Sequence, residues 1–229
     1  MAPWSGITAD EMRLLETTFW SAGGSRHAMA EELGFSKSKA NALIAGLLEQ
    51  GLLAEAGLQR SSGGRRPENL QLHADLGVLV GVDIGATSLG VAVLQPDLTV
   101  LAQHEEAADV RDGPAVVLAR VRALMRELLG RCGRTARDVF GIGIGVPGPV
   151  NFEIGQLVNP PLMPAWDSFS IRDYLREDYA APVFVDNDVN LMALGELWRL
   201  KRSLSNFLVI KIGTGIGCGI VCHLSLIHI

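Results

Sequence analysis

Two glycine-rich turns, each placed between apolar segments of strand length, constrain the fold of this chain more than any other feature. The first turn reads DIGATS from Asp83, and the second reads KIGTGIG from Lys211. Short apolar runs bounded by glycine are typical of β-strands. Strands are therefore expected at 78–84, 89–95, 207–212 and 217–222. Because Lys211 and four glycines interrupt the apolar stretch from 207, we interpret this stretch as two strands rather than a membrane span.

Between the two turns, apolar runs and segments of helical periodicity alternate. Further strands are predicted at 98–104, 139–145 and 182–185, and helices at 114–130, 170–178 and 189–201. Three closely spaced strands followed by helix–strand alternation predict a mixed α/β sheet. With 48% hydrophobic and 20% charged residues among 229, the chain can bury a sizeable core and is not expected to be disordered.

The first 75 residues have a different pattern, in which three helices precede a hairpin. Capping signals predict helices that begin after Thr8 (with Glu11 as a capping box), Ser25 and Ser36 and that end at Gly23–Gly24, Gly34 and Gly51. In the third helix one core-facing stripe is formed by Ala40, Leu43, Ile44, Leu47 and Leu48. Two strand-like segments, 52–57 and 68–73, then flank a loop. We therefore predict an N-terminal domain over 1–75 and a second domain over 76–223.

A short helix, a turn and a longer helix have the arrangement of a helix-turn-helix, whose second helix presents its first residues to the major groove of DNA. The candidate DNA-binding residues there are Ser36, Lys37, Ser38, Lys39 and Asn41. On the hairpin loop, Arg60, Arg65 and Arg66 would suit a narrow minor groove. Between 26 and 66 six Lys and Arg residues exceed four acidic residues, although the net charge of −5 does not suggest a general polyanion binder. The alternative is a three-helix bundle with solvated lysines.

The two glycine-rich turns are also candidate phosphate sites. Gly85 is suited to a positive φ, so that backbone amides and the Thr87 hydroxyl could grip a phosphate while Asp83 orients a hydrated Mg²⁺. The second turn repeats this pattern with Gly213, Thr214 and Gly215. One such turn is weak evidence because glycine hairpins are common, but two in one chain favour nucleotide binding.

A third segment, VDNDVNLMALGELW from Val185, predicts a strand that runs into an amphipathic helix. An ionised Asp188 at the helix N-terminus could accept a proton from a sugar hydroxyl that attacks a γ-phosphate, and Asn187 could hold a neighbouring hydroxyl. Simple capping of the helix by Asp186 or Asp188 is the alternative. In GIGIGVPGPVN, from Gly141, small residues would let the backbone approach a ligand, or would form a buried strand and a turn.

Together these segments resemble the ROK family of repressors, open reading frames and sugar kinases. DIGATS is similar to its first phosphate motif and GTGIGCGI to its second, while GIGIGVPGPVN, the NPP…W segment at 159–166 and VDNDVNLMALGE are similar to its sugar-site segments. The resemblance covers about 77–222 and implies a two-lobed, actin-like ATPase (ribonuclease H-like) α/β fold. An N-terminal winged helix with a Gly-Arg-Arg-Pro wing, as at 64–67, is similar to the regulator branch of the family.

The resemblance implies roles for individual residues. A sugar pocket would be lined by Gly148, Asn159, Asn187 and Asp188. Nucleotide phosphates would be contacted by Asp83, Gly85, Thr87, Gly213, Thr214 and Gly215. Only in a kinase member would Asp188 be the catalytic base, with ATP and Mg²⁺ as cofactors.

Two departures from the family pattern bear on these roles. Ala86 and Ser88 stand where kinase members usually have a glycine and a lysine, so a methyl group and a missing cation would disfavour phosphate at the first turn. The family's Glu-x-Gly-His sugar clamp and zinc cysteines are also absent. We therefore expect an incomplete sugar-kinase-like domain, with the zinc site of the family beyond this chain.

The C-terminal residues raise two further expectations. The final LSLIHI, at 224–229, looks like a translated transposon-end adapter and is expected to be a non-native tail. No metal site is expected at Cys218, Cys222 and His223, because a fourth ligand is not evident.

We therefore expect a cytoplasmic ROK-family transcriptional repressor, which binds operator DNA through a winged helix and a sugar or sugar phosphate through its kinase-like domain. A homodimer or higher homo-oligomer is expected, because two-fold DNA readers match palindromic half-sites. Three cysteines and the absence of a signal-peptide pattern fit the reducing cytosol, and no membrane partner is expected. One alternative is an ATP-dependent hexose kinase, glucokinase-like, with an added DNA-binding domain. A structural or protein-interaction module is the other, but it would leave the paired phosphate turns unexplained.

Overall fold

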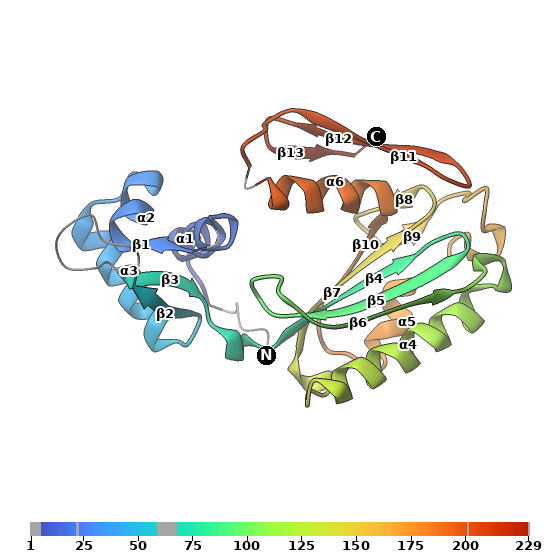
Figure 1. The fold of residues 1–229 in the computed structure, drawn as a ribbon, viewed down its shortest axis with the longest axis horizontal. Helices are drawn as coiled ribbons and strands as arrows, with labels where there is room; N and C mark the ends of the chain where they lie inside the picture. The colour runs from blue at the N-terminus through green and yellow to red at the C-terminus, as the bar shows by residue number, and fades with distance from the viewer. Residues whose placement is uncertain (1–5, 22, 59–67, 201, 229) are drawn as a thin grey trace. The chain divides into compact units, whose positions relative to one another are not determined.

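The computed structural model describes residues 6–21, 23–58, 68–200 and 202–228. Within it the chain divides into two compact units, Met1–Gly77 and Val78–Ile229, two residues beyond the boundary expected at 75. Figure 1 colours the first unit from blue to teal and the second from green to red.

The described part of the first unit combines α-helices with short strands. These are α1 (Ala9–Trp20), β1 (Gly24–Ser25), α2 (Arg26–Leu33), α3 (Lys37–Glu49), β2 (Leu53–Leu58) and β3 (Glu68–Leu72). The predicted capping box is confirmed, because the Thr8 hydroxyl accepts the Glu11 amide at 3.3 Å and Glu11 Oε2 accepts the Thr8 amide at 2.8 Å. The Ser25 and Ser36 hydroxyls likewise accept amides in the first turns of α2 and α3, as expected.

A small antiparallel sheet, in the order β1–β3–β2, completes the first unit. The first helix ends just before Gly23 and Gly24, as expected: Gly23 adopts a φ of 94° and donates its amide to the Thr18 carbonyl at 3.0 Å, and Gly24 pairs with Leu70 in this sheet. The predicted stripe of α3 is confirmed, with fully buried Ala40, Ile44 and Leu47 and half-buried Leu43 and Leu48. The predicted loop residues Arg60, Arg65 and Arg66 lie outside the described residues.

A five-stranded mixed sheet forms the centre of the second unit, in the order β10–β7–β4–β5–β6 (Figure 1). Its strands are β4 (Val78–Ile84), β5 (Ser88–Leu94), β6 (Val100–Ala107), β7 (Val139–Val146) and β10 (Val183–Asn187). Because β4 pairs antiparallel with β5 and parallel with β7, the predicted mixed sheet is confirmed. Two predicted helices are also confirmed: α4 (Pro114–Arg131) packs on β5 and β6, and α5 (Ile171–Arg176) packs on β10.

A helix and a second antiparallel sheet form a further layer of this unit, drawn in orange and red in Figure 1. They are α6 (Asp188–Arg199), β11 (Phe207–Ile212), β12 (Ile216–Cys222) and β13 (Ser225–Ile227). Glycines let α6 approach β12, because a Cβ at Gly217 or Gly219 would lie 2.5 Å from Val189 of the helix. The prediction of two paired strands is confirmed for β11 and β12. No helix in the described part of the chain is long and apolar enough to cross a membrane.

Several short elements were not predicted. A two-stranded hairpin follows β7, formed by β8 (Val150–Asn151) and β9 (Gln156–Leu157), and β13 extends the sheet beyond β12. The 3₁₀ turns are η1 (Ala74–Leu76), η2 (Val110–Asp112), η3 (Ala136–Asp138) and η4 (Pro164–Trp166). Elements of two or three residues leave no periodicity in the sequence, so tertiary pairing alone defines them.

Candidate functional site

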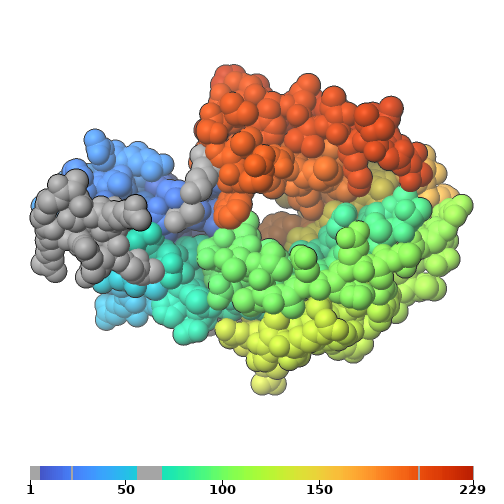
Figure 2. Space-filling view, in the orientation of Figure 1, coloured from blue at the N-terminus to red at the C-terminus, as the bar shows by residue number. Residues whose placement is uncertain are grey.

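A pocket of about 540 Å³ lies in the second unit, where the two glycine-rich turns meet the start of α6. Figure 2 shows this unit hollowed between the green region of β4–β6 and the orange and red C-terminal layer. The pocket wall includes Ala86 and Thr87, 147–150, 186–190, Lys211 and 213–218. Segments that the sequence identified separately as phosphate and sugar motifs are therefore brought together.

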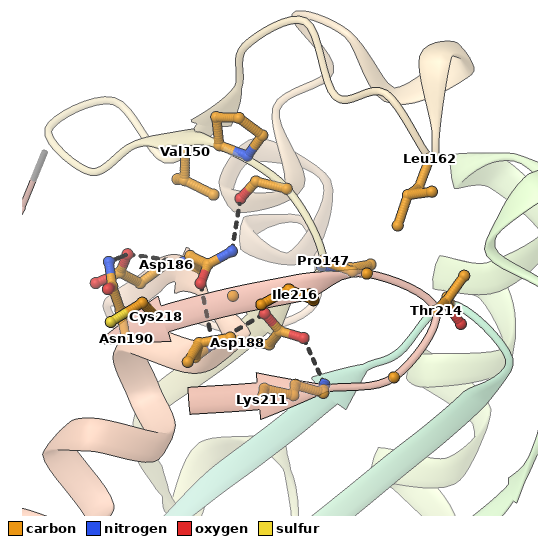
Figure 3. Close-up of a pocket in the computed structure, with 18 of the residues that line it drawn as sticks. Pro147, Val150, Leu162, Asp186, Asp188, Asn190, Lys211, Thr214, Ile216 and Cys218 are labelled. Atoms are coloured by element: carbon orange, nitrogen blue, oxygen red, sulfur yellow. Dashed lines mark hydrogen bonds and ion pairs between the residues drawn. The ribbon is translucent and has the colours of Figure 1, made fainter. Parts of the chain in front are cut away.

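Asp188 is the first residue of α6 and lines this pocket (Figure 3). Its side chain is only 8% exposed. Asp188 Oδ1 accepts the amide of Val189 at 2.9 Å, and Asp188 Oδ2 accepts a hydrogen bond from the Lys211 ammonium at 2.6 Å. The helix N-terminus and the ammonium thus both place positive charge beside a carboxylate that has little access to water.

Lys211 is a pocket residue that the sequence identified only as an interruption of an apolar stretch. Exposure alternates along β11, and Lys211 lies on the same, less exposed face as Phe207 and Val209. A charged side chain on the inner face of an apolar strand requires a partner, because burial of an unpaired charge is unfavourable. The sequence signal that could have identified Lys211 is a single charge within the apolar run FLVIKI, directly before the second glycine-rich turn.

Asn187 links the start of α6 to the loop after β7. Its Oδ1 accepts the Val189 amide at 3.0 Å, and its Nδ2 donates to the Gly148 carbonyl at 3.1 Å. Gly148 is buried, and a Cβ there would lie 3.1 Å from Pro160 Cβ. Both residues line the pocket, where Asn187 acts as the helix cap and as a tether for the loop.

Two further polar residues, Asp186 and Asn190, line the same wall. Asp186 is 3% exposed, and its Oδ1 accepts the Asn187 amide at 2.7 Å and Asn190 Nδ2 at 2.9 Å. The N-cap of α6 is therefore Asn187, and the alternative that Asp186 or Asp188 caps this helix is wrong. Asn190 was not predicted; it lies in the first turn of α6, and Asp186 is on the strand that leads into this helix.

The glycines of the two phosphate motifs serve different purposes. A Cβ at Gly213 or Gly215 would meet no atom within 4 Å, so open space lies in front of the backbone at these pocket positions. Gly85 does not adopt the positive φ expected of it. Its amide donates to the Ser88 carbonyl at 2.8 Å, and a Cβ would lie 2.7 Å from Ser88 Oγ. Glycine at 85 is thus explained by a tight turn against Ser88 rather than by a left-handed backbone.

Charges interact around the predicted phosphate sites. Asp83 lies on β4 just before the first glycine-rich turn. Its side chain is exposed, yet partial desolvation by the surrounding chain raises its pKa above the ordinary value. The positive charge of Lys211 opposes this rise in pKa, whereas the carboxylates of Asp188 and Glu105 add to it. Thr87 and Thr214, the predicted hydroxyl donors of the two turns, both line the pocket.

Two predicted features of the sugar site do not reach the pocket wall. Asn159 is exposed, adopts a φ of 45° and donates its backbone amide to Asp167 Oδ1 at 2.8 Å. Trp166, from the NPP…W segment, is fully buried in the core, where Nε1 donates to the Val110 carbonyl at 2.9 Å. The structure thus gives Trp166 a packing role and leaves Asn159 outside the pocket.

The C-terminal cysteines do not converge on a metal site. Cys218 is exposed on β12, and Cys222 Sγ lies 3.2 Å from His223 Nδ1. Among the residues that the structure describes, no group of three or more His, Cys, Asp or Glu side chains is arranged to hold a metal.

In the first unit, the start of α3 presents the predicted DNA-binding side chains to solvent. The exposed residues are Ser36, Lys37, Ser38, Lys39 and Asn41. Lys39 is engaged within the unit, because its Nζ lies 2.6 Å from Asp10 Oδ2 and 4.3 Å from the centroid of the Phe35 ring. This pairing was not predicted and restricts how Lys39 can reach a DNA backbone.

Comparison with known proteins finds relatives of two kinds, repressors and sugar kinases. The model of the ROK family matches residues 79–228. A xylose repressor from Caldicellulosiruptor bescii is 27% identical over 198 residues, which cover 86% of this chain and 49% of that protein. A glucokinase from Halalkalibacterium halodurans is 33% identical over 150 residues, which cover 65% of this chain and 45% of that protein. The chain spans about half the length of the curated relatives it matches.

A solved structure is similar over both units. A ROK family transcriptional regulator, a homolog of the E. coli MLC protein, aligns with a TM-score of 0.69 and 23% identity, covering 95% of this chain and 56% of that chain. This similarity concerns the fold. It confirms the mixed α/β, sugar-kinase-type architecture predicted for the second unit.

Proposed function

The chain belongs to the ROK family, and on this basis we propose that it is a sugar-responsive transcriptional repressor. The first unit is a winged helix that binds operator DNA, with α2 and α3 as the helix-turn-helix and the β2–β3 hairpin as the wing. The pocket at Asp188 and Asn187 binds a sugar or sugar phosphate. The protein acts as a homodimer or higher homo-oligomer on a palindromic operator.

The observation that carries this proposal is the exposed start of α3. Ser36, Lys37, Ser38 and Asn41 are exposed at the N-terminal end of a helix whose opposite stripe is buried. Lysine and serine can reach phosphates, and asparagine can pair with adenine, so this end of the helix suits a major groove. A sugar kinase would have no use for such a surface.

The lengths of the matches also support a regulator. The 198 residues aligned with the xylose repressor are more than the second unit contains, so that similarity extends into the first unit. The 150 residues aligned with the glucokinase do not exceed the second unit. Because these two relatives are a xylose repressor and a glucokinase, xylose and glucose are the first sugars to test as ligands.

Sugar binding would act by shifting the population of DNA-binding arrangements, since a ligand changes an equilibrium only by binding one state more tightly than the other. The test is footprinting of the full-length protein on the DNA upstream of its own operon, with and without sugars. We expect a protected palindrome whose occupancy changes with one sugar. Absence of specific protection under every condition would contradict the proposal.

The second candidate is an ATP-dependent hexose kinase, favoured by the meeting of Asp188 with both glycine-rich turns in one pocket. The open space at Gly213 and Gly215 fits an approaching phosphate, which the Thr87 and Thr214 hydroxyls would help to hold. ATP and Mg²⁺ would then supply the phosphoryl group and its charge neutralisation, and Asp188 would accept the proton of the sugar hydroxyl.

The ion pair in the pocket weakens this second candidate. One oxygen of Asp188 accepts from the Val189 amide and the other from the Lys211 ammonium, so a sugar hydroxyl that gives up its proton would have to share the carboxylate with a cation. A coupled assay of ADP release against a panel of hexoses separates the two functions. We expect no turnover above background. Turnover that disappears in Asp188→Asn would establish the kinase instead.

A further inference from the structure

Lys211 and Asp188 form a donor–acceptor pair on the wall of the pocket, contributed by two different elements. Lys211 comes from β11 and Asp188 from the start of α6, and 2.6 Å separate Nζ from Oδ2 (Figure 3). Both side chains line the pocket that also contains Asn187 and Gly148. The pair therefore stands beside the residues expected to hold a sugar.

The pair retains hydrogen-bonding capacity after its own contact is made. An ammonium group has three donors, and Asp188 is the one hydrogen-bond acceptor of Lys211 Nζ among the residues that the structure describes. A carboxylate offers about four acceptor positions, of which Asp188 uses one for Val189 and one for Lys211. The Lys211 side chain is 37% exposed, so its remaining donors are accessible from the pocket.

A ligand that uses both partners must donate to Asp188 and accept from Lys211. A hydroxyl group can do either, so two neighbouring hydroxyls of a sugar fit a donor and an acceptor that lie side by side. Lys211 and Asp188 together carry no net charge, and the second buried carboxylate on this wall, Asp186, has its Oδ2 2.8 Å from Nε2 of His228, which also lines the pocket. An uncharged sugar is therefore favoured over a phosphate ester or a sugar acid, because the Lys211 ammonium is already paired with a carboxylate and would have to be shared with a second anion.

We propose that Lys211 is a specificity-determining residue of the pocket, which donates to one hydroxyl of an uncharged sugar while Asp188 accepts from the adjacent hydroxyl. This inference rests on the proposed sugar-sensing function and names the ligand class of that site. The contact between Lys211 and the ligand selects sugars whose neighbouring hydroxyls have the matching spacing and orientation.

The experiment is calorimetric titration of the full-length protein and of Lys211→Met with D-xylose, D-glucose, their phosphate esters and the deoxy analogues that lack one hydroxyl each. A hydrogen bond to a charged group contributes enough that the variant should bind its parent sugar about 10- to 100-fold more weakly. The deoxy analogue that lacks the hydroxyl contacted by Lys211 should bind the wild type and the variant equally. If Lys211 had only a structural role, the variant would bind every sugar and every deoxy analogue more weakly by a similar factor. No single analogue would then bind the wild type and the variant equally.

Two further variants keep the test decisive. Arg199→Met removes a positive charge from the other end of α6, outside the pocket, and should leave every sugar affinity unchanged. If thermal melts show that Lys211→Met does not fold, Lys211→Arg keeps the charge with a wider, planar donor group and should change the order of preference among the sugars.

The possible failures are distinguishable. Equal affinities of the wild type and Lys211→Met for each parent sugar, or an unchanged order of preference in Lys211→Arg, would overturn the role of Lys211 while the regulator stands. Tighter binding of phosphate esters than of the free sugars would overturn the uncharged ligand class. A wild type that binds no sugar of the panel would overturn both this inference and the proposed sugar-sensing function.

Discussion

Asp10 of α1 and Lys39 of α3 form an ion pair, with 2.6 Å between Oδ2 and Nζ. The same ammonium lies 4.3 Å from the centroid of the Phe35 ring. Asp10 thus competes with a DNA phosphate for a lysine at the start of the proposed recognition helix. A carboxylate in this position limits binding to DNA of any sequence, since phosphate contacts carry no sequence information.

Asp10→Asn should therefore strengthen binding to unrelated DNA. We expect affinity to rise about three- to tenfold at low salt and the slope of log affinity against log salt to steepen by about one, because Lys39 can then neutralise one more phosphate. Fluorescence anisotropy over a salt series measures both quantities. Glu16→Gln removes the same charge from another exposed position of α1 and is the matched control. Equal effects of the two variants would attribute the gain to net charge alone.

The packing of α6 on β12 makes a second prediction. A Cβ at Gly219 would lie 2.5 Å from the Val189 carbonyl oxygen and 2.8 Å from Ala193 Cβ, so backbone must move to accept it. Gly219→Ala should lower the free energy of unfolding by about 1–3 kcal/mol. Gly195 lies at an exposed position of α6 where a Cβ would meet no atom within 4 Å. Gly195→Ala should therefore raise the free energy of unfolding by about 0.5–1 kcal/mol. Urea denaturation measures both, and destabilisation by the second variant would contradict the explanation.

The elements that could be predicted from the sequence are those with local causes. Thr8 and Glu11 lie in one turn of chain, and the hydroxyl of Ser36 reaches an amide three residues away, so their caps need no tertiary information. The alternation of β4 and the stripe of α3 follow from periods of two and 3.6 residues. These local features are enough to predict the order of the longer helices and strands in both units, but not the short strands and 3₁₀ turns between them.

The features that could not be predicted depend on partners distant in the sequence. β1 exists because Gly24 meets Leu70, and the Lys211–Asp188 pair exists because β11 passes the start of α6. Trp166 shows the same limit, because its motif suggested a sugar site whereas its neighbours bury it. The sequence is therefore enough to assign a residue to a motif, but the residues that it contacts become known only from the fold.

Trp166 offers a test of that assignment. Its indole is fully buried and donates to the Val110 carbonyl at 2.9 Å. Trp166→Phe should lower the free energy of unfolding by about 1–3 kcal/mol, since the buried carbonyl loses its donor and the smaller ring leaves a void. Sugar affinity should stay within about twofold of the wild type, because hydrogen-bond losses outside a pocket act mainly on stability. A large loss of sugar affinity in a Trp166→Phe variant that still folds would indicate that Trp166 contributes to the sugar site.

The charge of Asp83 makes stability depend on pH in a direction that can be tested. Desolvation raises the pKa of this carboxyl above its ordinary value of 3.8, with Lys211 opposing the shift and Asp188 adding to it. Between the ordinary and the raised pKa the folded protein binds more protons than the unfolded chain, so stability falls as pH rises through that window. Above the window the loss is constant, and below the ordinary pKa it disappears.

Asp83→Asn should therefore be more stable than the wild type at about pH 7, and the difference should shrink as the pH falls towards the ordinary pKa of aspartate. Asp138→Asn is the control of opposite sign, because hydrogen bonds from the Thr135 amide and hydroxyl lower the pKa of Asp138. That variant should be less stable than the wild type at about pH 7, and its deficit should also shrink in acid. Thermal melts across a pH series measure both. Lower stability of Asp83→Asn at neutral pH would mean that attraction to Lys211 outweighs desolvation at this carboxylate.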